Sequence, residues 1–159
     1  MARILQSLLL VLLCLSAATA RAGDTAAADA AYKKGDYKSA ARDLRALAEK
    51  GEAKAQYRLG VLYDQGKGVK QDRAKAAQWY TRAADQGYIP AQYNLAILYY
   101  NGEGVEQDLV LAYAWLQVSI ARGYHQAATA RDAVAAQMTK REVDDAKEMA
   151  GKILRRQPR

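Results

Sequence analysis

Few side chains in this sequence could act as nucleophiles, general bases or metal ligands. His125 is the one histidine and Cys14 the one cysteine among 159 residues, and Ser39 and Ser119 are the serines beyond the N-terminal segment. A hydrolytic triad needs a nucleophile, a base and an orienting acid within mutual hydrogen-bond reach. A zinc site needs several His, Cys or carboxylate ligands at a set spacing. Neither arrangement is present, so the sequence predicts no catalytic residue, no metal and no cofactor.

Other polar patterns have structural explanations. Asp144 and Asp145 lie where we expect a helix to start, and the helix dipole stabilises carboxylates there. The two Gly-x-Gly loops, at 66–68 and 102–104, lack the preceding strand of a nucleotide-binding loop. Lysine and arginine are spread along the chain, so the net charge of +7 predicts a solvated surface and no binding of nucleic acid.

The chain begins with MARILQSLLLVLLCLSAATARAGD, which has the composition of an export signal. Arg3 precedes an apolar run from Leu8 to Leu15, and small residues follow in Ala-x-Ala order up to Ala22. The run is shorter than the about 20 residues that a membrane span needs. We therefore predict a cleaved signal peptide over residues 1–22, no membrane span in the mature chain, and a periplasmic or secreted location. An uncleaved anchor is the alternative.

A shift of 36 residues superposes one part of the sequence on another. The segment AQYRLGVLYDQGKGVKQD at residues 55–72 aligns with AQYNLAILYYNGEGVEQD at residues 91–108. The same shift superposes Ala76 on Ala112, Trp79 on Trp115 and Gly87 on Gly123. A fixed period of this size indicates a repeat architecture.

Each unit predicts two helices. Ala55, Leu59 and Leu62 recur at spacings of three and four and form one apolar stripe. A glycine ends this first helix, and an aspartate caps the second, whose buried side carries alanines, Trp79 and Tyr80. The positions that we assign to this scaffold are Gly66, Gly68, Asp72, Ala76, Trp79, Gly87, Gly102, Gly104, Asp108, Ala112, Trp115 and Gly123.

The block from Ala55 to Gly87 resembles the Sel-one-like repeat, a relative of the tetratricopeptide repeat. The run G-x-G-V-x-Q-D, with a tryptophan seven residues after the aspartate, is specific to that family. The second copy departs from the first at Ala96, which replaces Gly60, and at 116–120, where LQVSI replaces YTRAA. The resemblance implies an all-α fold, a short right-handed α-solenoid of antiparallel helix pairs.

We predict a single domain over residues 23–159. A partial N-terminal unit at 25–51 precedes repeats at about 52–87 and 88–123 and capping helices over 124–156. The helix expected from Asp108 to Ala121 is apolar nearly all round and must be covered on more than one side. Helices expected at 124–138 and from Thr139 onward supply this cover, and Thr139 with Glu142 forms a capping box for the last one.

The resemblance implies a non-enzymatic adaptor for a protein or peptide partner in the cell envelope. In tetratricopeptide-like stacks the first helix of each pair lines the concave surface, where Tyr and Arg are favoured contact residues. Tyr57 and Tyr93 have packing in the core as their alternative role. The predicted binding surface consists of Lys54, Tyr57, Arg58, Val61, Asp64, Asn94, Ile97, Tyr100 and Asn101.

Two other functions stay open. Some proteins that resemble this repeat act on or bind cell-wall and β-lactam compounds, or assist polysaccharide export. A cell-envelope enzyme or a peptidoglycan- or polysaccharide-binding protein is therefore the alternative. The basic tail KILRRQPR could also make a weak electrostatic contact with an anionic surface. Such a contact would weaken as salt is added.

Overall fold

The computed structural model describes residues 26–158, and the predicted signal peptide lies outside the described residues. Within this range the chain is helical and has no strand, which confirms the predicted all-α class. A helical segment at 26–33 is followed by α2 (Tyr37–Glu49), α3 (Ala53–Gln65), α4 (Arg73–Asp85), α5 (Ile89–Asn101), α6 (Leu109–Ala121), α7 (Ala127–Ala135) and α8 (Lys140–Arg156). None of these helices is long and apolar enough to cross a membrane.

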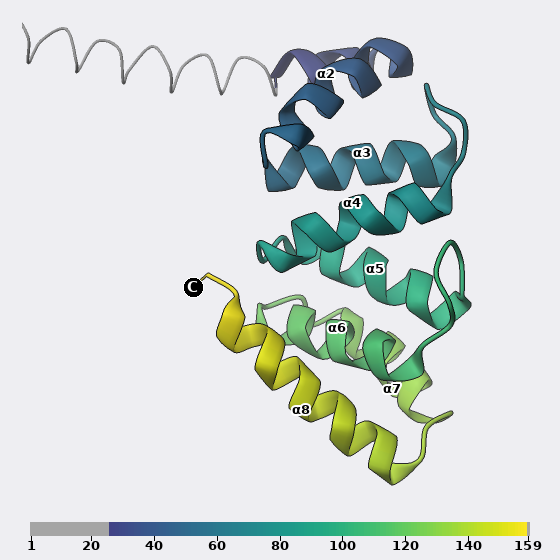
Figure 1. Cartoon of the computed structure of the whole chain (residues 1–159), viewed down its shortest axis with the longest axis vertical. Coiled ribbons are helices and arrows are strands. Elements are labelled where there is room, and N and C mark those ends of the chain that lie inside the picture. Colours follow the sequence, from purple (N-terminus) through teal and green to yellow (C-terminus); the bar gives the residue numbers. More distant parts are fainter. Residues whose placement is uncertain (1–25, 159) are drawn as a thin grey trace, which may run out of the picture.

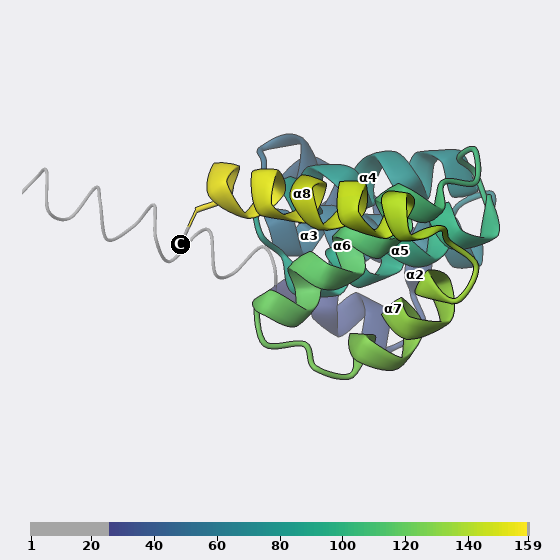
Figure 2. The ribbon, with the colours of Figure 1, turned by 90° about the horizontal axis from the view of Figure 1, so that it is seen from below.

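The helices form a stack in which each packs against the next along the chain from α2 to α7, and α8 packs back on α6 (Figure 1). This is the predicted solenoid, with α2 and α8 at opposite ends. Figure 2 views the stack from the α8 end. The stack explains the apolar composition of α6, because α5, α7 and α8 all cover it.

Aspartates at a spacing of 36 residues start the second helix of each unit. Side chains of Asp36, Asp72 and Asp108 accept hydrogen bonds from backbone N–H groups three residues later, at 3.1, 2.9 and 2.8 Å. Each bond satisfies one of the donors that a helix leaves open at its N-terminus. The first helix of each full unit ends at a left-handed glycine, Gly66 or Gly102, as predicted.

The C-terminal helices follow the sequence prediction with one change. Thr139 and Glu142 form the expected capping box at the start of α8. α7 is shorter at both ends than the helix expected at 124–138, because residues 124–126 are still part of the turn after α6 and residues 136–138 already belong to the turn before α8. In that turn the N–H of Tyr124 donates to the carbonyl of Ser119 at 2.9 Å.

The two repeated tryptophans are not buried alike. Trp115 is 6% exposed, whereas Trp79 is half-buried and the Arg82 guanidinium lies 4.6 Å from its ring centre. The prediction that Trp79 is on the buried side of its helix is therefore only partly right, and Tyr80, at 1% exposed, is the large buried side chain of α4. The difference arises because α6 is covered by α7 and α8, while α4 packs mainly between α3 and α5.

Two sequence differences between the repeats form a single packing change. A Cβ atom at Gly60 would lie 2.7 Å from both Cδ1 and Cε1 of Tyr80, so the tyrosine ring occupies the space of the missing side chain. One period later the same two positions are Ala96 and Leu116, both fully buried. A glycine facing an aromatic ring in one unit is thus replaced by an alanine and a leucine in the other.

The loops between paired helices approach the preceding unit closely. A Cβ atom at Gly104 would lie 2.2 Å from the carbonyl carbon of Arg73, at the start of α4. A Cβ atom at Gly68 would be equally close to the carbonyl oxygen of Tyr37, at the start of α2. Both glycines have positive φ, 73° at Gly104 and 71° at Gly68. Each loop therefore stacks on the helix start one unit earlier, in contact that only glycine permits.

Glutamine side chains link the units near the other ends of the helices. In the first repeat, Gln56 donates to the carbonyl of Ala48 at 3.1 Å and accepts from Gln86 at 2.8 Å. In the second repeat the residue equivalent to Gln86 in sequence is Arg122. The hydrogen-bonding position of Gln86 is instead occupied by Gln157, at the end of α8. Its amide donates to the carbonyl of Ala84 at 2.6 Å. Figure 1 shows the end of α8 returning toward α4 and α5.

Candidate functional site

Three of the predicted binding residues line one pocket on α3. Tyr57, Arg58 and Val61 enclose a space of about 210 Å³ together with Tyr32 from the N-terminal helical segment. The sequence did not indicate Tyr32, because the turn at Gly35 is shorter than the loop after α3 and shifts the 36-residue register. Counting back from the capping Asp36, instead of applying the period, would have placed it near the end of the first helix.

The two cations predicted to face a partner are paired within the chain. Arg58 forms an ion pair with Asp29, and the Lys54 ammonium lies 3.4 Å from the other oxygen of the same carboxylate. Asp29 belongs to the N-terminal helical segment, so these contacts tie that segment to α3. Arg58 therefore serves as a wall of the pocket whose charge is already balanced, and a partner would meet its remaining N–H groups and its flat face.

Tyr57 packs on the core, which is the alternative role that the sequence left open, and it also lines the pocket. Its ring centre lies 5.8 Å from that of Tyr80 and 5.2 Å from that of Tyr88. Burial raises the pKa of Tyr57, the neighbouring Tyr88 phenol raises it further, and a hydrogen bond to Asn94 acts in the opposite direction. The residue is half-buried, so one side packs on the core while the other lines the pocket.

The tyrosine pair recurs one period later. Tyr93 and Tyr124, which correspond to Tyr57 and Tyr88, have ring centres 5.3 Å apart. All four rings are partly buried against the larger core cluster. We call these four residues the tyrosine row. Tyr88 and Tyr124 were missed in the sequence, although the period carries the signal, because a tyrosine follows the glycine at both 87 and 123.

The remaining predicted residues are distributed along α5 and at helix ends. Asn94 and Ile97 are half-buried on α5, one period after Arg58 and Val61. The hydroxyl of Tyr100 accepts a hydrogen bond from Gln137 at 2.8 Å, which holds its ring toward the end of α7.

Two further predicted residues lie at the ends of first helices. Asp64 near the end of α3 accepts from the Arg73 guanidinium at 3.2 Å, and Asn101 at the end of α5 is exposed. The structure thus brings together the predicted residues at the middle of α3 and places Asp64, Tyr100 and Asn101 toward the loops.

The candidate catalytic side chains are placed as structural or surface groups. Ser119 is fully buried, and its hydroxyl donates to the carbonyl of Leu116 at 2.8 Å. His125 is exposed in the turn before α7, and Asp144 lies 2.9 Å from the Lys140 ammonium. Among residues 26–158 no three His, Cys, Asp or Glu side chains gather as a metal site would require.

The basic tail is anchored at its final residues within the described range. Gln157 is 7% exposed, and Arg122 donates to the carbonyl of Pro158 at 2.8 Å. Arg155 and Arg156 are exposed on the last turn of α8. Contact with an anionic surface would therefore use the exposed side of a fixed helix end.

Comparisons with known proteins agree with this architecture. The family model described as the Sel1 repeat matches residues 53–88 and 89–124. A protective antigen of uropathogenic Escherichia coli with an SLR fold superposes with a TM-score of 0.81 at 31% identity, covering 86% of this chain and 30% of that one. A Sel1 repeat protein from Oxalobacter formigenes superposes with a TM-score of 0.65 at 26% identity, covering 80% of this chain and 54% of that one.

This chain therefore spans less than two thirds of the length of either solved structure. A search of the curated proteins finds no match.

Proposed function

The chain belongs to the Sel1 repeat family, as the G-x-G-V-x-Q-D run predicted, and on this premise we propose that it is a scaffold whose concave groove binds a protein or peptide. Sel1 repeat proteins generally act as scaffolds for protein interactions and are generally not enzymes. The groove consists of the pocket at Tyr32, Tyr57, Arg58 and Val61 and the tyrosine row beside it.

The observation that carries the proposal is the pocket on α3. It combines aromatic rings, an aliphatic wall and an arginine within about 210 Å³. Tyrosine and arginine offer large contact area and hydrogen-bonding groups, and they are enriched among residues that dominate binding energies. The pocket has the size of one or two side chains, so we propose that it accepts a single anchoring residue of the partner.

The tyrosine row indicates how the rest of a partner would lie. Tyr57 and Tyr93 occupy the same place on successive first helices, and their packed neighbours follow the same period. Partly buried rings at this regular spacing present an apolar surface with polar edges. An extended segment that crosses both repeats could use this surface while its backbone bonds to the tyrosine hydroxyls. We therefore favour a peptide-like segment over a compact small molecule.

The location in the proposal depends on the N-terminal sequence. The apolar run and the Ala-x-Ala residues at the start of the chain support export, and with it a partner in the cell envelope. Fractionation of cells that produce a C-terminally tagged protein, with N-terminal sequencing of the product, tests this part. Recovery in the cytosol with the leader intact would contradict it.

The groove is tested by capture of partners from an envelope extract with paired variants. Val61→Gln replaces the aliphatic wall of the pocket with a polar side chain, and Val105→Gln makes the same change in the loop after α5. Both positions are half-buried, so the two variants face a similar cost in stability. We expect a captured protein to be lost with Val61→Gln and retained with Val105→Gln, with equal helical circular dichroism. Equal retention by both variants would reject the groove.

A further inference from the structure

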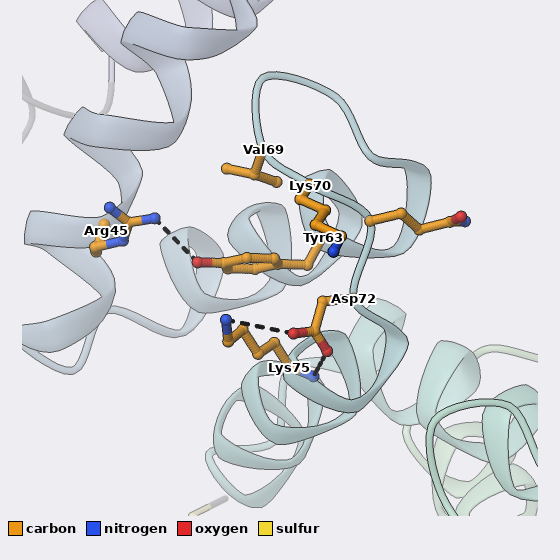
Figure 3. Close-up of a pocket in the computed structure, with 7 residues that line it drawn as sticks. Arg45, Tyr63, Val69, Lys70, Asp72 and Lys75 are labelled. Carbon is orange, nitrogen blue, oxygen red and sulfur yellow. Dashed lines mark hydrogen bonds and ion pairs between the residues drawn. The ribbon is translucent and has the colours of Figure 1, made fainter.

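A second pocket lies at the loop that joins α3 to α4, and it is strongly basic. Its volume is about 630 Å³. Figure 3 shows Tyr63 at its centre, with the hydroxyl directed toward Arg45 of α2 and with Val69 and Lys75 on opposite sides of the ring. The residues that line it are Arg45, Tyr63, Val69, Lys70, Gln71, Asp72 and Lys75. Three of these side chains are cations and one is an anion. None of them lines the groove pocket, so this site does not depend on the proposed function.

One cation in this pocket is already balanced within the chain. The Lys75 ammonium lies 3.3 Å from a carboxylate oxygen of Asp72 and 5.5 Å from the ring centre of Tyr63. The other oxygen of Asp72 accepts the N–H of Lys75 at 2.9 Å. These contacts fix both side chains at the start of α4. The charge that remains for a ligand therefore belongs to Arg45 and Lys70.

Arg45 and Lys70 have no carboxylate at ion-pair distance among residues 26–158. The Arg45 guanidinium donates one hydrogen bond, at 3.0 Å, to the hydroxyl of Tyr63. Its other N–H groups keep their capacity to bind an anion, and the hydroxyl that accepts this bond can still donate its own proton. Guanidinium, ammonium and phenol thus present donors to the same open space.

The second repeat contains the same pocket with the opposite charge. The loop after α5 encloses about 540 Å³, lined by Tyr99, Val105, Glu106, Gln107, Asp108 and Leu111. The tyrosine, valine, glutamine and aspartate of the first pocket recur in place, but Glu106 replaces Lys70 and Leu111 replaces Lys75. Thr81 stands in the position of Arg45. Both repeats adopt the same helix–loop–helix fold with these different side chains, so the fold does not require the basic charges.

From this we infer that the loop pocket of the first repeat binds an acidic peptide segment. Arg45 and Lys70 receive the carboxylates, and the ring of Tyr63 and the methyl groups of Val69 contact the aliphatic part of a glutamate side chain. Two uncompensated cations match two carboxylates. A carboxylate fits the flat fork of a guanidinium. The fixed carboxylate of Asp72 disfavours more highly charged polyanions at the same place.

The probe for this site is a fluorescent oligoglutamate peptide, with oligoglutamine as the neutral comparison. Lys70→Glu and Arg45→Thr install the residues that the second repeat already has at these places, so both variants are expected to fold. Lys147→Glu makes the same charge change on the exposed surface of α8, at the far end of the stack (Figure 1). Affinities are measured by fluorescence anisotropy at low and at physiological salt, and helical content by circular dichroism.

We expect the unmodified protein to bind oligoglutamate but not oligoglutamine, with affinity that falls as salt is added. Lys70→Glu and Arg45→Thr should each weaken binding about tenfold, because each removes one of the two cations that attract the carboxylates of the peptide in the pocket. Lys147→Glu should change it less than about twofold.

Equal losses in Lys70→Glu and Lys147→Glu would overturn the inference, since binding would then follow only the net charge of the chain. Binding to phosphatidylglycerol vesicles in the absence of any binding to oligoglutamate would also overturn it. The groove variant Val61→Gln should leave oligoglutamate binding unchanged. The basic pocket and the groove can therefore fail independently.

Discussion

The close contact between Gly60 and Tyr80 predicts that substitutions at these two positions, to the residues of the second repeat, are energetically coupled. In Gly60→Ala the new methyl carbon would be placed 2.7 Å from two ring carbons of Tyr80, which is 1% exposed. Carbon atoms prefer a separation of about 3.5–4.0 Å. The ring must therefore move by about 1 Å within a packed core, and overpacking of this kind costs about 1–3 kcal/mol.

The same substitution has a favourable part. Alanine is better than glycine in the interior of a helix by about 1 kcal/mol. With tyrosine at position 80 we expect Gly60→Ala to lower the free energy of unfolding by up to about 2 kcal/mol. In the Tyr80→Leu background the ring is absent, as in the second repeat, and Gly60→Ala should raise it by up to about 1 kcal/mol. The coupling energy between the two sites is then about 1–3 kcal/mol.

Urea unfolding of the four proteins, followed by circular dichroism and tryptophan fluorescence together, measures this coupling. Gly151→Ala on α8 is the control, because a Cβ atom there meets only the end of the flexible Arg155 side chain at 3.4 Å. It should be neutral or stabilising in either background. If Gly60→Ala has the same effect with tyrosine and with leucine at position 80, the two sequence differences are unrelated and the packing argument is wrong.

Two other substitutions test how the units are joined. Gly104→Ala should lower the free energy of unfolding by more than about 4 kcal/mol, because it adds a collision with the backbone of α4 to the strain of positive φ. Gly123→Ala, at φ 101° with no atom within 4 Å of the added carbon, should lower it by only about 1–2 kcal/mol. Urea unfolding compares the two variants, and equal losses would show that the loop does not pack against α4. Gln157→Ala should lower the free energy of unfolding by about 1–3 kcal/mol, since it leaves the buried carbonyl of Ala84 with a poorer hydrogen-bond partner. Arg156→Ala, at an exposed position, should have little effect. Thermal unfolding of the two variants distinguishes a fixed chain end from a loose one.

Local patterns in the sequence predicted most of the fold. The aspartate caps, the left-handed glycines and the capping box at Thr139 depend on residues a few positions apart, and each was found where expected. Trp79 was predicted less well, because its burial depends on a third layer of helices that covers only α6. The sequence showed that both tryptophans belong to the repeat, but not how many neighbours each helix has.

The candidate site was predicted in part, for the same physical reason. Val61 and Tyr57 are on one helix, and the period identified them. Asp29 and Tyr32 come from a unit with a shorter turn, so the fixed period could not align them with α3. Gln157 contacts a carbonyl 73 residues earlier in the chain. Contacts of that range follow from the path of the whole stack and leave no local signal.

The glutamine at the end of α8 constrains how this protein could grow by duplication. It occupies the hydrogen-bonding position that Gln86 has one unit earlier, and Arg122 donates a hydrogen bond to the carbonyl of the adjacent Pro158. A unit inserted between α6 and α7 would carry α8 away from α4 and α5 and break the hydrogen bonds of Gln157 to Gln92 and to the carbonyl of Ala84. A unit inserted ahead of α3 would leave these bonds intact, so lengthening of the array is favoured near its beginning.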